Sequence, residues 1–168
     1  GAEVMVKLNA RELTALMDVA GPEGGEAESA TSIDAIQTAA DKLAASVGGD
    51  SSRVPFYIGV TDGPYTSYLI QSSRGVVSSI HEFKMPQLPR PLVNAIGAGD
   101  AVASGTILRW TDSMEFPIGS EETDISAVDA FRFGLSVGCA SCMTTENSVF
   151  ALEDAMAMYG GIIVDRVR

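Results

Sequence analysis

The stretch that decides the fold is residues 94–100, Asn-Ala-Ile-Gly-Ala-Gly-Asp, which is followed by small residues as far as Gly105. We expect a helix directly after this stretch, from Ala101. Glycines before a helix let the backbone approach a ligand closely, and the unpaired N–H groups at a helix start attract an anion. A carboxylate such as Asp100 can accept a proton from an attacking hydroxyl group. The pattern also fits a tight turn with an acidic helix start, so by itself it leaves both interpretations open.

Outward from this stretch, strand and helix patterns alternate along the chain. Strands are predicted at residues 4–8, 54–60, 65–71, 75–80 and 161–167, with a further strand segment at 81–85. Helices are predicted at 33–47, 101–110, 125–143 and 152–159. Loops are predicted at 48–52 and 118–124, and 19–30 is interpreted as a loop insertion. This alternation predicts an α/β layered domain.

The first predicted strand ends at Asn9, a residue type that commonly caps helices. Glu12 follows three positions later, and the two side chains together make a capping-box pattern. The sequence therefore predicts a second helix start here. On this pattern alone, capping is the favoured role for both residues.

The composition excludes several classes of protein. The chain has 168 residues, of which 46% are hydrophobic, so it can bury a core. Its net charge of −11 and the lack of a Lys/Arg cluster argue against a nucleic-acid partner. No apolar run approaches the roughly 20 residues of a membrane helix, and we expect no signal peptide. His81 and the Cys139-x-x-Cys142 pair are too few ligands for a structural zinc site, so we expect the cysteines to pack in the core.

Residues 94–105 closely resemble the second signature of the ribokinase-type (PfkB) carbohydrate kinases: Asn or Asp, two variable residues, Gly-Ala-Gly-Asp, then small residues. The resemblance implies that Asp100 is the base for the sugar hydroxyl. It also implies that Gly97, Ala98 and Gly99 form the anion hole for the transferred phosphoryl group. Asn94 aligns with the residue that opens the motif, beside the nucleotide.

Three other places resemble the same family, in its order along the chain. Residues 7–13 are similar to its Lys-Pro-Asn-x-x-Glu-Leu segment, with Leu8 in place of the Pro, which implies that Asn9 and Glu12 organise magnesium and phosphate. Residues 60–63 resemble the strand-end motif beside the nucleotide, which implies that Thr61 and Gly63 flank it. The family usually has a second glycine three positions on, and this chain has Thr66 there.

The third place is the segment 133–141, which looks like the small-residue helix that flanks the adenine. Gly138 and Ser141 inherit that role from the resemblance, although close relatives often carry Asn where Ser141 stands. Close packing through small residues is the other interpretation, and both can hold. Within the family, three short features are nearest the tagatose-6-phosphate kinase and 1-phosphofructokinase branch: Asn94 at the start of the motif, the pattern of this helix and the C-terminal residues 158–167.

The resemblance implies a ribokinase-like three-layer α/β/α sandwich, of which residues 1–168 are only the C-terminal, nucleotide-binding half. We expect the N-terminal sugar-binding half and its lid to be supplied by a missing part of the chain or by a second chain. The implied activity is ATP- and Mg²⁺-dependent phosphorylation of a sugar or sugar phosphate, in the cytoplasm, or in a plastid if a transit peptide has been removed. The alternative is a non-catalytic, kinase-shaped scaffold subunit in a larger complex, favoured by Thr66, by Ser141 and by the absent half.

Overall fold

The computed structural model describes residues 3–19, 30–47, 55–111 and 126–168. The chain divides into two compact units, residues 1–84 with 164–168 and residues 85–163. Each unit has a hydrophobic cluster of its own. The predicted loops at 48–52 and 118–124, and residues 20–29 of the predicted insertion, lie outside the described residues.

The first unit is built on a sheet whose strands are neighbours in the same order as along the chain. They are β1 Val4–Asn9, β2 Phe56–Thr61, β3 Ser67–Ser73, β4 Val76–Lys84 and β5 Ile163–Arg166. The pair β1–β2 is parallel, whereas β2–β3 and β3–β4 are antiparallel. In the parallel pair Asn9 is the partner of Thr61, so both residues lie at the carboxyl ends of neighbouring strands.

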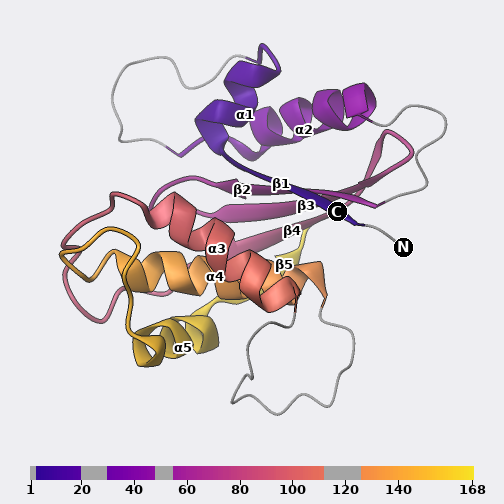
Figure 1. Cartoon of the computed structure of the whole chain (residues 1–168). Coiled ribbons are helices and arrows are strands. Elements are labelled where there is room, and N and C mark those ends of the chain that lie inside the picture. Colours follow the sequence, from indigo (N-terminus) through magenta and orange to yellow (C-terminus); the bar gives the residue numbers. More distant parts are fainter. Residues whose placement is uncertain (1–2, 20–29, 48–54, 112–125) are drawn as a thin grey trace. The chain divides into compact units, whose positions relative to one another are not determined.

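Two helices, α1 (Ala10–Leu16) and α2 (Ile33–Val47), lie together on one side of this sheet (Figure 1). Alternate residues of the strands point to the helices because successive side chains of a strand point to opposite faces. Of the apolar positions predicted to line one face of α2, Ile36, Ala40 and Leu43 are buried, whereas Val47 at its end is exposed. The largest fully buried side chains of this cluster are Leu13, Ile36, Ile58, Val60, Ile70 and Ile80.

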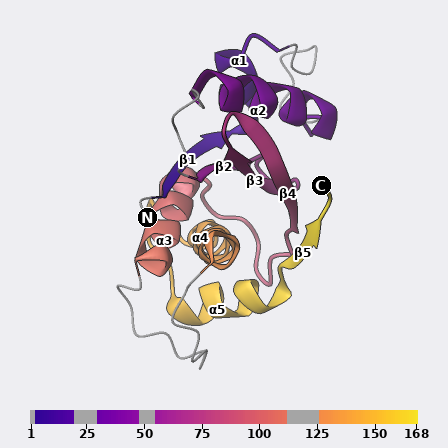
Figure 2. The ribbon, with the colours of Figure 1, turned by 90° about the vertical axis from the view of Figure 1, so that its right-hand side faces the viewer.

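The second unit is a group of three helices, α3 (Ala98–Trp110), α4 (Ala127–Ser141) and α5 (Leu152–Gly161). Helix α4 packs against both α3 and α5 (Figure 2). Glycines let α3 and α4 approach closely: a Cβ atom on Gly134 would lie 2.0 Å from Thr106 Oγ1 and 2.5 Å from Val102 O. The sequence prediction of close packing through small residues on α4 is therefore confirmed.

A polar network also links the three helices. Arg109, only 8% exposed, donates from Nε to Asp129 Oδ2 at 2.7 Å. The hydroxyl group of Tyr159 donates to the other oxygen of Asp129, and Arg132 lies over the Tyr159 ring, 4.4 Å from its centre. Burial, followed by the hydrogen bond to the Asp129 carboxylate, raises the pKa of Tyr159. The network pairs the nearly buried Arg109 guanidinium with a carboxylate, because burying an unpaired charge would lower the stability of the fold.

Most element positions follow the sequence prediction, with two differences. Helix α3 begins at Ala98 instead of Ala101, because Gly97 adopts a left-handed conformation and ends the preceding turn. Residues 76–84 form one continuous strand, β4, where the sequence suggested two segments. Its partner β3 bonds to it along both segments, past a register irregularity at Gln71/Ser72.

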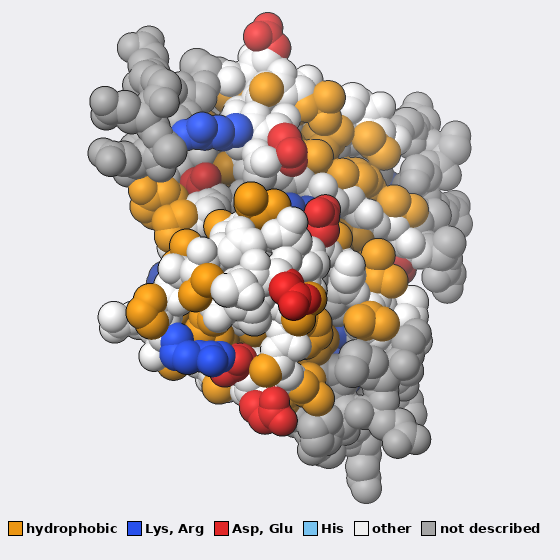
Figure 3. Space-filling model, turned by 60° about the vertical axis from the view of Figure 1, so that its left-hand side comes forward, with side chains coloured by type: hydrophobic (Ala, Val, Ile, Leu, Met, Phe, Trp, Pro, Cys, Tyr) orange, Lys and Arg blue, Asp and Glu red, His pale blue; other side chains and the backbone are white. Residues whose placement is uncertain are grey.

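Figure 3 shows no basic patch on the face that it displays. On that face, the Lys and Arg side chains of the described residues are few and separate, and hydrophobic side chains are spread among polar ones. Among the described helices, none combines the length and apolar character needed to cross a bilayer. His81 lies on β4, half-buried, and burial lowers its pKa.

Candidate active site

The start of α3 is formed by a glycine in an unusual conformation. Gly97, the N-cap residue, has φ +82° and caps the helix with no side-chain hydrogen bond. The first helical bond runs from Ala101 N–H to Gly97 O at 2.9 Å, and Ala98 N–H donates to Ala95 O at 3.2 Å. An α-helix supplies no partner for the N–H groups of its first turn, which here include Gly99 and Asp100. This helix end is therefore suited to accept an anion.

Asp100 lies in the same first turn, and its side chain is exposed. A carboxylate in this position can accept a proton from an attacking hydroxyl group. The structure thus brings Gly97, Ala98, Gly99 and Asp100 together at one helix end, as the sequence predicted.

Asn94 holds the segment that leads into this turn. Its Oδ1 accepts a hydrogen bond from Ile96 N at 2.9 Å. Its Nδ2 donates to Thr145 O at 3.2 Å and to Asn147 Oδ1 at 2.8 Å. All three bonds are internal to the protein, so the observed role of Asn94 is to fix the glycine turn. Its predicted place beside the nucleotide stays a prediction.

The loop that follows α4 completes this support, and the sequence analysis did not single it out. Ser148 Oγ donates to Gly97 O at 3.0 Å, and Ser148 itself has φ +59°. A Cβ atom on Gly97 would lie 2.5 Å from Ser148 Oγ and 3.2 Å from Ser148 N. The position therefore requires glycine both for its backbone conformation and for this close approach. The polar run at residues 144–148, typical of turns, was the available signal.

Gly138 and Ser141 lie on α4, beneath the first turns of α3. A Cβ atom on Gly138 would lie 2.4 Å from Val102 Cγ2 and 3.1 Å from Ala98 O. Ser141 is 2% exposed, and its Oγ donates to Gly138 O at 2.8 Å. Gly138 lets α4 approach the backbone of Ala98, whereas Ser141 is bonded within its own helix. The predicted contact of both residues with the nucleotide stays a prediction.

In the first unit, Asn9 and Glu12 form the predicted capping box at the start of α1. Asn9 Oδ1 accepts from Glu12 N at 2.8 Å, and Glu12 Oε2 accepts from Asn9 N at 2.8 Å. The capping prediction is therefore confirmed. One oxygen of each side chain is occupied in the cap, which leaves the second carboxylate oxygen of the exposed Glu12 for another partner.

The turn after β2 carries Thr61 and Gly63. Tyr65 N–H donates to Asp62 O at 3.0 Å and closes the turn, and Gly63 has φ +58°. Asp62 Oδ2 accepts from Thr31 N at 2.6 Å, which ties the turn to the segment before α2. A Cβ atom on Gly63 would have nothing within 4 Å, so here only the backbone conformation favours glycine.

The described residues could bind Mg²⁺ only together with the phosphate groups of a nucleotide, which would supply most of its ligands. They contain no group of three His, Cys, Asp or Glu side chains able to hold a metal by themselves. Mg²⁺ keeps several water ligands and commonly binds through one or two carboxylates plus substrate phosphates. Glu12 is an exposed carboxylate of the kind that such a complex needs.

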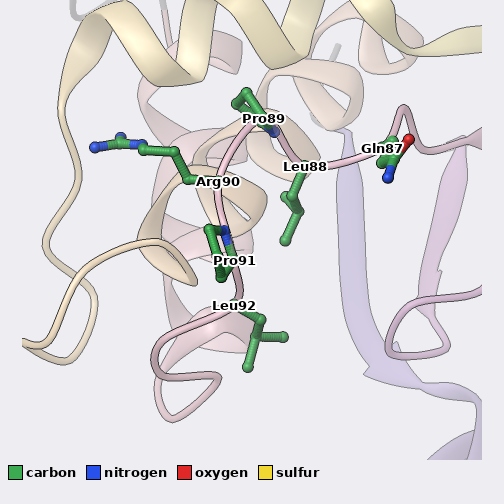
Figure 4. Close-up of a pocket in the computed structure, with 6 residues that line it drawn as sticks. All are labelled: Gln87, Leu88, Pro89, Arg90, Pro91 and Leu92. Carbon is green, nitrogen blue, oxygen red and sulfur yellow. The ribbon is translucent and has the colours of Figure 1, made fainter.

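The second unit also has a pocket that is lined by none of these motif residues. It is lined by Gln87, Leu88, Pro89, Arg90, Pro91 and Leu92, and Figure 4 shows Arg90 extending away from Leu88 and Leu92. Arg90 pairs with Asp154 of α5. The lining holds no nucleophile or general base, so this pocket has no catalytic assignment.

Comparison with known proteins rests on structure alone. No family model matches the sequence, and no curated protein matches it. A putative phosphofructokinase from Staphylococcus aureus superposes with a TM-score of 0.64 at 15% identity, over 97% of this chain and 42% of that one. Phosphofructokinase-2 from Escherichia coli, in complex with potassium, gives 0.58 at 19%, over 95% and 41%.

The fold is ribokinase-like. A possible 1-phosphofructokinase from Thermotoga maritima also superposes, with a TM-score of 0.54 at 19% identity, over 100% of this chain and 49% of that one. The predicted α/β fold class is thus confirmed. The chain spans less than half the length of each of these proteins.

Proposed function

We propose that the protein carrying this chain transfers a phosphoryl group from ATP to a hydroxyl group of a sugar or sugar phosphate. The observation that carries the proposal is the start of α3, where first-turn amides and the exposed Asp100 carboxylate meet at one helix end. The structural neighbours, named as phosphofructokinases, support the same reaction class. Their names also favour a sugar phosphate as the acceptor.

Each residue of this helix start has a distinct role in the proposed reaction. Asp100 accepts the proton of the attacking hydroxyl group. The turn of Gly97, Ala98 and Gly99 forms the anion hole for the phosphoryl group in transfer, because fixed dipoles need no rearrangement during the reaction. The Gly99 N–H lies in the first helical turn and has no partner within the helix, whereas the Ala98 N–H donates to Ala95 O. Asn94 keeps the turn in place through its three hydrogen bonds.

The remaining predicted residues would handle the nucleotide and its metal. Mg²⁺, when bound, neutralises phosphate charge, and Asn9 with Glu12 would hold it together with the phosphates. The family resemblance gives Thr61 and Gly63, at the carboxyl end of β2, a place beside the nucleotide, and it gives Gly138 and Ser141 on α4 a place beside the adenine. A sugar-binding part from the remainder of the protein, or from a second chain, would complete the enzyme.

A non-catalytic scaffold subunit is the second candidate, and one observation favours it. Ser141 stands where close relatives of the kinases carry Asn, and its hydroxyl group is buried and bonded to its own helix. The adenine side of the site is thereby left with fewer polar contacts. Isothermal titration of the complete protein with ATP and Mg²⁺ separates the two: a scaffold shows no binding, and an enzyme binds.

The direct test of the kinase proposal is Asp100→Asn in the complete protein. We expect kcat to fall by about 100-fold or more, as is usual when a general base is removed, with ATP binding retained. Glu153→Gln is the matched control, because Glu153 is also an exposed acid in a helix first turn. The control is expected to keep full activity. Turnover by Asp100→Asn close to that of the control would refute the role of Asp100.

A further inference from the structure

Two cysteines lie near the C-terminal end of α4, and the sulfur atom of one of them contacts that of a methionine. Cys139 and Cys142 are three positions apart, and Cys142 keeps helical dihedral angles (φ −66°, ψ −16°) as the C-cap residue. Residues three apart lie on the same face of a helix. The thiol of Cys139 donates to Met85 Sδ at 3.8 Å. Both cysteines are free and partly buried.

We propose that Met85, Cys139 and Cys142 form a binding site for a soft monovalent metal ion, Cu(I). Thiolate and thioether sulfur are the donors that select Cu(I). Three sulfurs placed about 2.3 Å from one metal in a trigonal plane lie about 4.0 Å from each other. The observed 3.8 Å between Cys139 Sγ and Met85 Sδ matches that spacing. Binding forms three metal–sulfur bonds and releases the two thiol protons to solvent.

Two other uses of these residues explain less of the arrangement. A structural zinc ion takes four ligands, and no group of three His, Cys, Asp or Glu exists in the part of the chain that the structure describes. Core packing accounts for Cys139, which contacts the cluster around Phe133 and Met158. It does not account for Cys142, which is partly exposed.

A metal at this site would affect the residues that hold the glycine turn in place. The carbonyl oxygen of Cys142 accepts hydrogen bonds from Val93 N at 2.8 Å and from Asn94 N at 3.2 Å. A metal bound to the Cys142 side chain would therefore fix the residue that holds the entrance to the motif at 94–100. Metal binding itself does not depend on the proposed kinase activity.

The test is a competition titration of the reduced, complete protein with Cu(I) under anaerobic conditions, with bicinchoninate as the coloured competitor. We expect one Cu(I) per chain to be withdrawn from the competitor. Cys139→Ser/Cys142→Ser should lose this binding. Met85→Leu should weaken it by about tenfold, the smaller end of what partners of a metal site contribute. Met156→Leu, which changes another methionine beside the same cluster, should bind as the unaltered protein does.

Three results would overturn the proposal: no stoichiometric binding, binding by the double variant equal to that of the unaltered protein, or equal affinities for Met85→Leu and Met156→Leu. X-ray absorption of the Cu(I)-loaded unaltered protein gives an answer that needs no variant to fold. Three sulfur neighbours at about 2.3 Å are expected. Nitrogen or oxygen neighbours in their place would contradict the site.

Discussion

The starts of α1 and α3 differ in how their first-turn amides are satisfied. At α1, Asn9 and Glu12 close the helix end with two reciprocal hydrogen bonds of 2.8 Å. At α3, the cap is Gly97, which has no side chain to offer. Both helix ends carry the same partial positive charge. The first end is closed by its own side chains, whereas the second is left open to an outside anion.

The difference shows that a helix start becomes a candidate anion site when no side chain caps its amide groups. Ordinary capping residues stabilise a helix by about 1 kcal/mol relative to alanine, and glycine at the same position is only a few tenths of a kcal/mol less favourable. The open end of α3 is compensated by hydrogen bonds from behind, from Asn94 and Ser148. Variants of the two helix starts can therefore separate stability from function.

The largest effect is expected for Gly97→Ala. The left-handed φ costs about 1–2 kcal/mol for a residue with a side chain. The Cβ atom, 2.5 Å from Ser148 Oγ, adds overpacking of about 1–3 kcal/mol. We expect a stability loss of about 2–5 kcal/mol in urea unfolding of the complete protein, together with loss of most activity.

Gly63→Ala is the matched control for this change. Gly63 also has a left-handed φ, but a Cβ atom there would meet nothing within 4 Å. It should show the backbone cost alone, about 1–2 kcal/mol. Equal stability losses for the two variants would show that the contact between Gly97 and Ser148 is not important.

A medium effect is expected for Asn9→Ala, about 1 kcal/mol of stability, because the cap of α1 is lost. Asn9→Ser should keep most of that stability, since serine caps helices nearly as well, but it removes the amide group. If Asn9 also helps to hold metal and phosphate, Asn9→Ser should lower activity at nearly unchanged stability.

Ser126→Ala is the control for the Asn9 variants. Ser126 Oγ accepts from Asp129 N at 3.1 Å as the cap of α4, and no catalytic role is proposed for it. This variant should lose stability and keep its activity per folded molecule. An Asn9→Ser protein with full activity would restrict Asn9 to capping.

The smallest effect is expected for Ser148→Ala, which removes the hydrogen bond to Gly97 O. An exposed hydrogen bond of this kind contributes about 0.5–1 kcal/mol. We expect a slight loss of stability and a several-fold drop in kcat, because the glycine turn is less well held. Thr38→Ala is the control: it removes an exposed hydrogen bond from a hydroxyl group to a backbone carbonyl oxygen, Thr38 Oγ1 to Asp34 O on α2, and should leave kcat unchanged. A kcat of Ser148→Ala equal to that of Thr38→Ala would remove the positioning role.

Much of the fold was predictable because the patterns are local. The apolar spacing of residues 33–47 gave α2 with its observed bounds, and the Asn9/Glu12 pattern gave the capping box. The helix at residues 152–159 was also found to within two residues of its end. In each case both the sequence pattern and the contacts that it predicts join residues only a few positions apart.

The candidate site was predictable only in part. The motif at 94–100 pointed to Asp100 and the glycines, but the helix start was placed three residues too late because φ at Gly97 was unknown. The loop at residues 144–148 was missed altogether. Its contacts with Asn94 and Gly97 span about fifty residues of sequence, and no local pattern encodes them.

The sequence by itself therefore determined the α/β class, the order of the elements and the residues that carry the proposed chemistry, since these depend on periodicity, capping and short motifs. Only the tertiary structure decided which of those residues are occupied in holding the fold. Asn94 and Ser141 have their hydrogen-bonding groups bound within the protein, whereas Asp100 is exposed. Hydrogen bonds between distant segments are fixed by packing in three dimensions, and that information is spread over the whole chain.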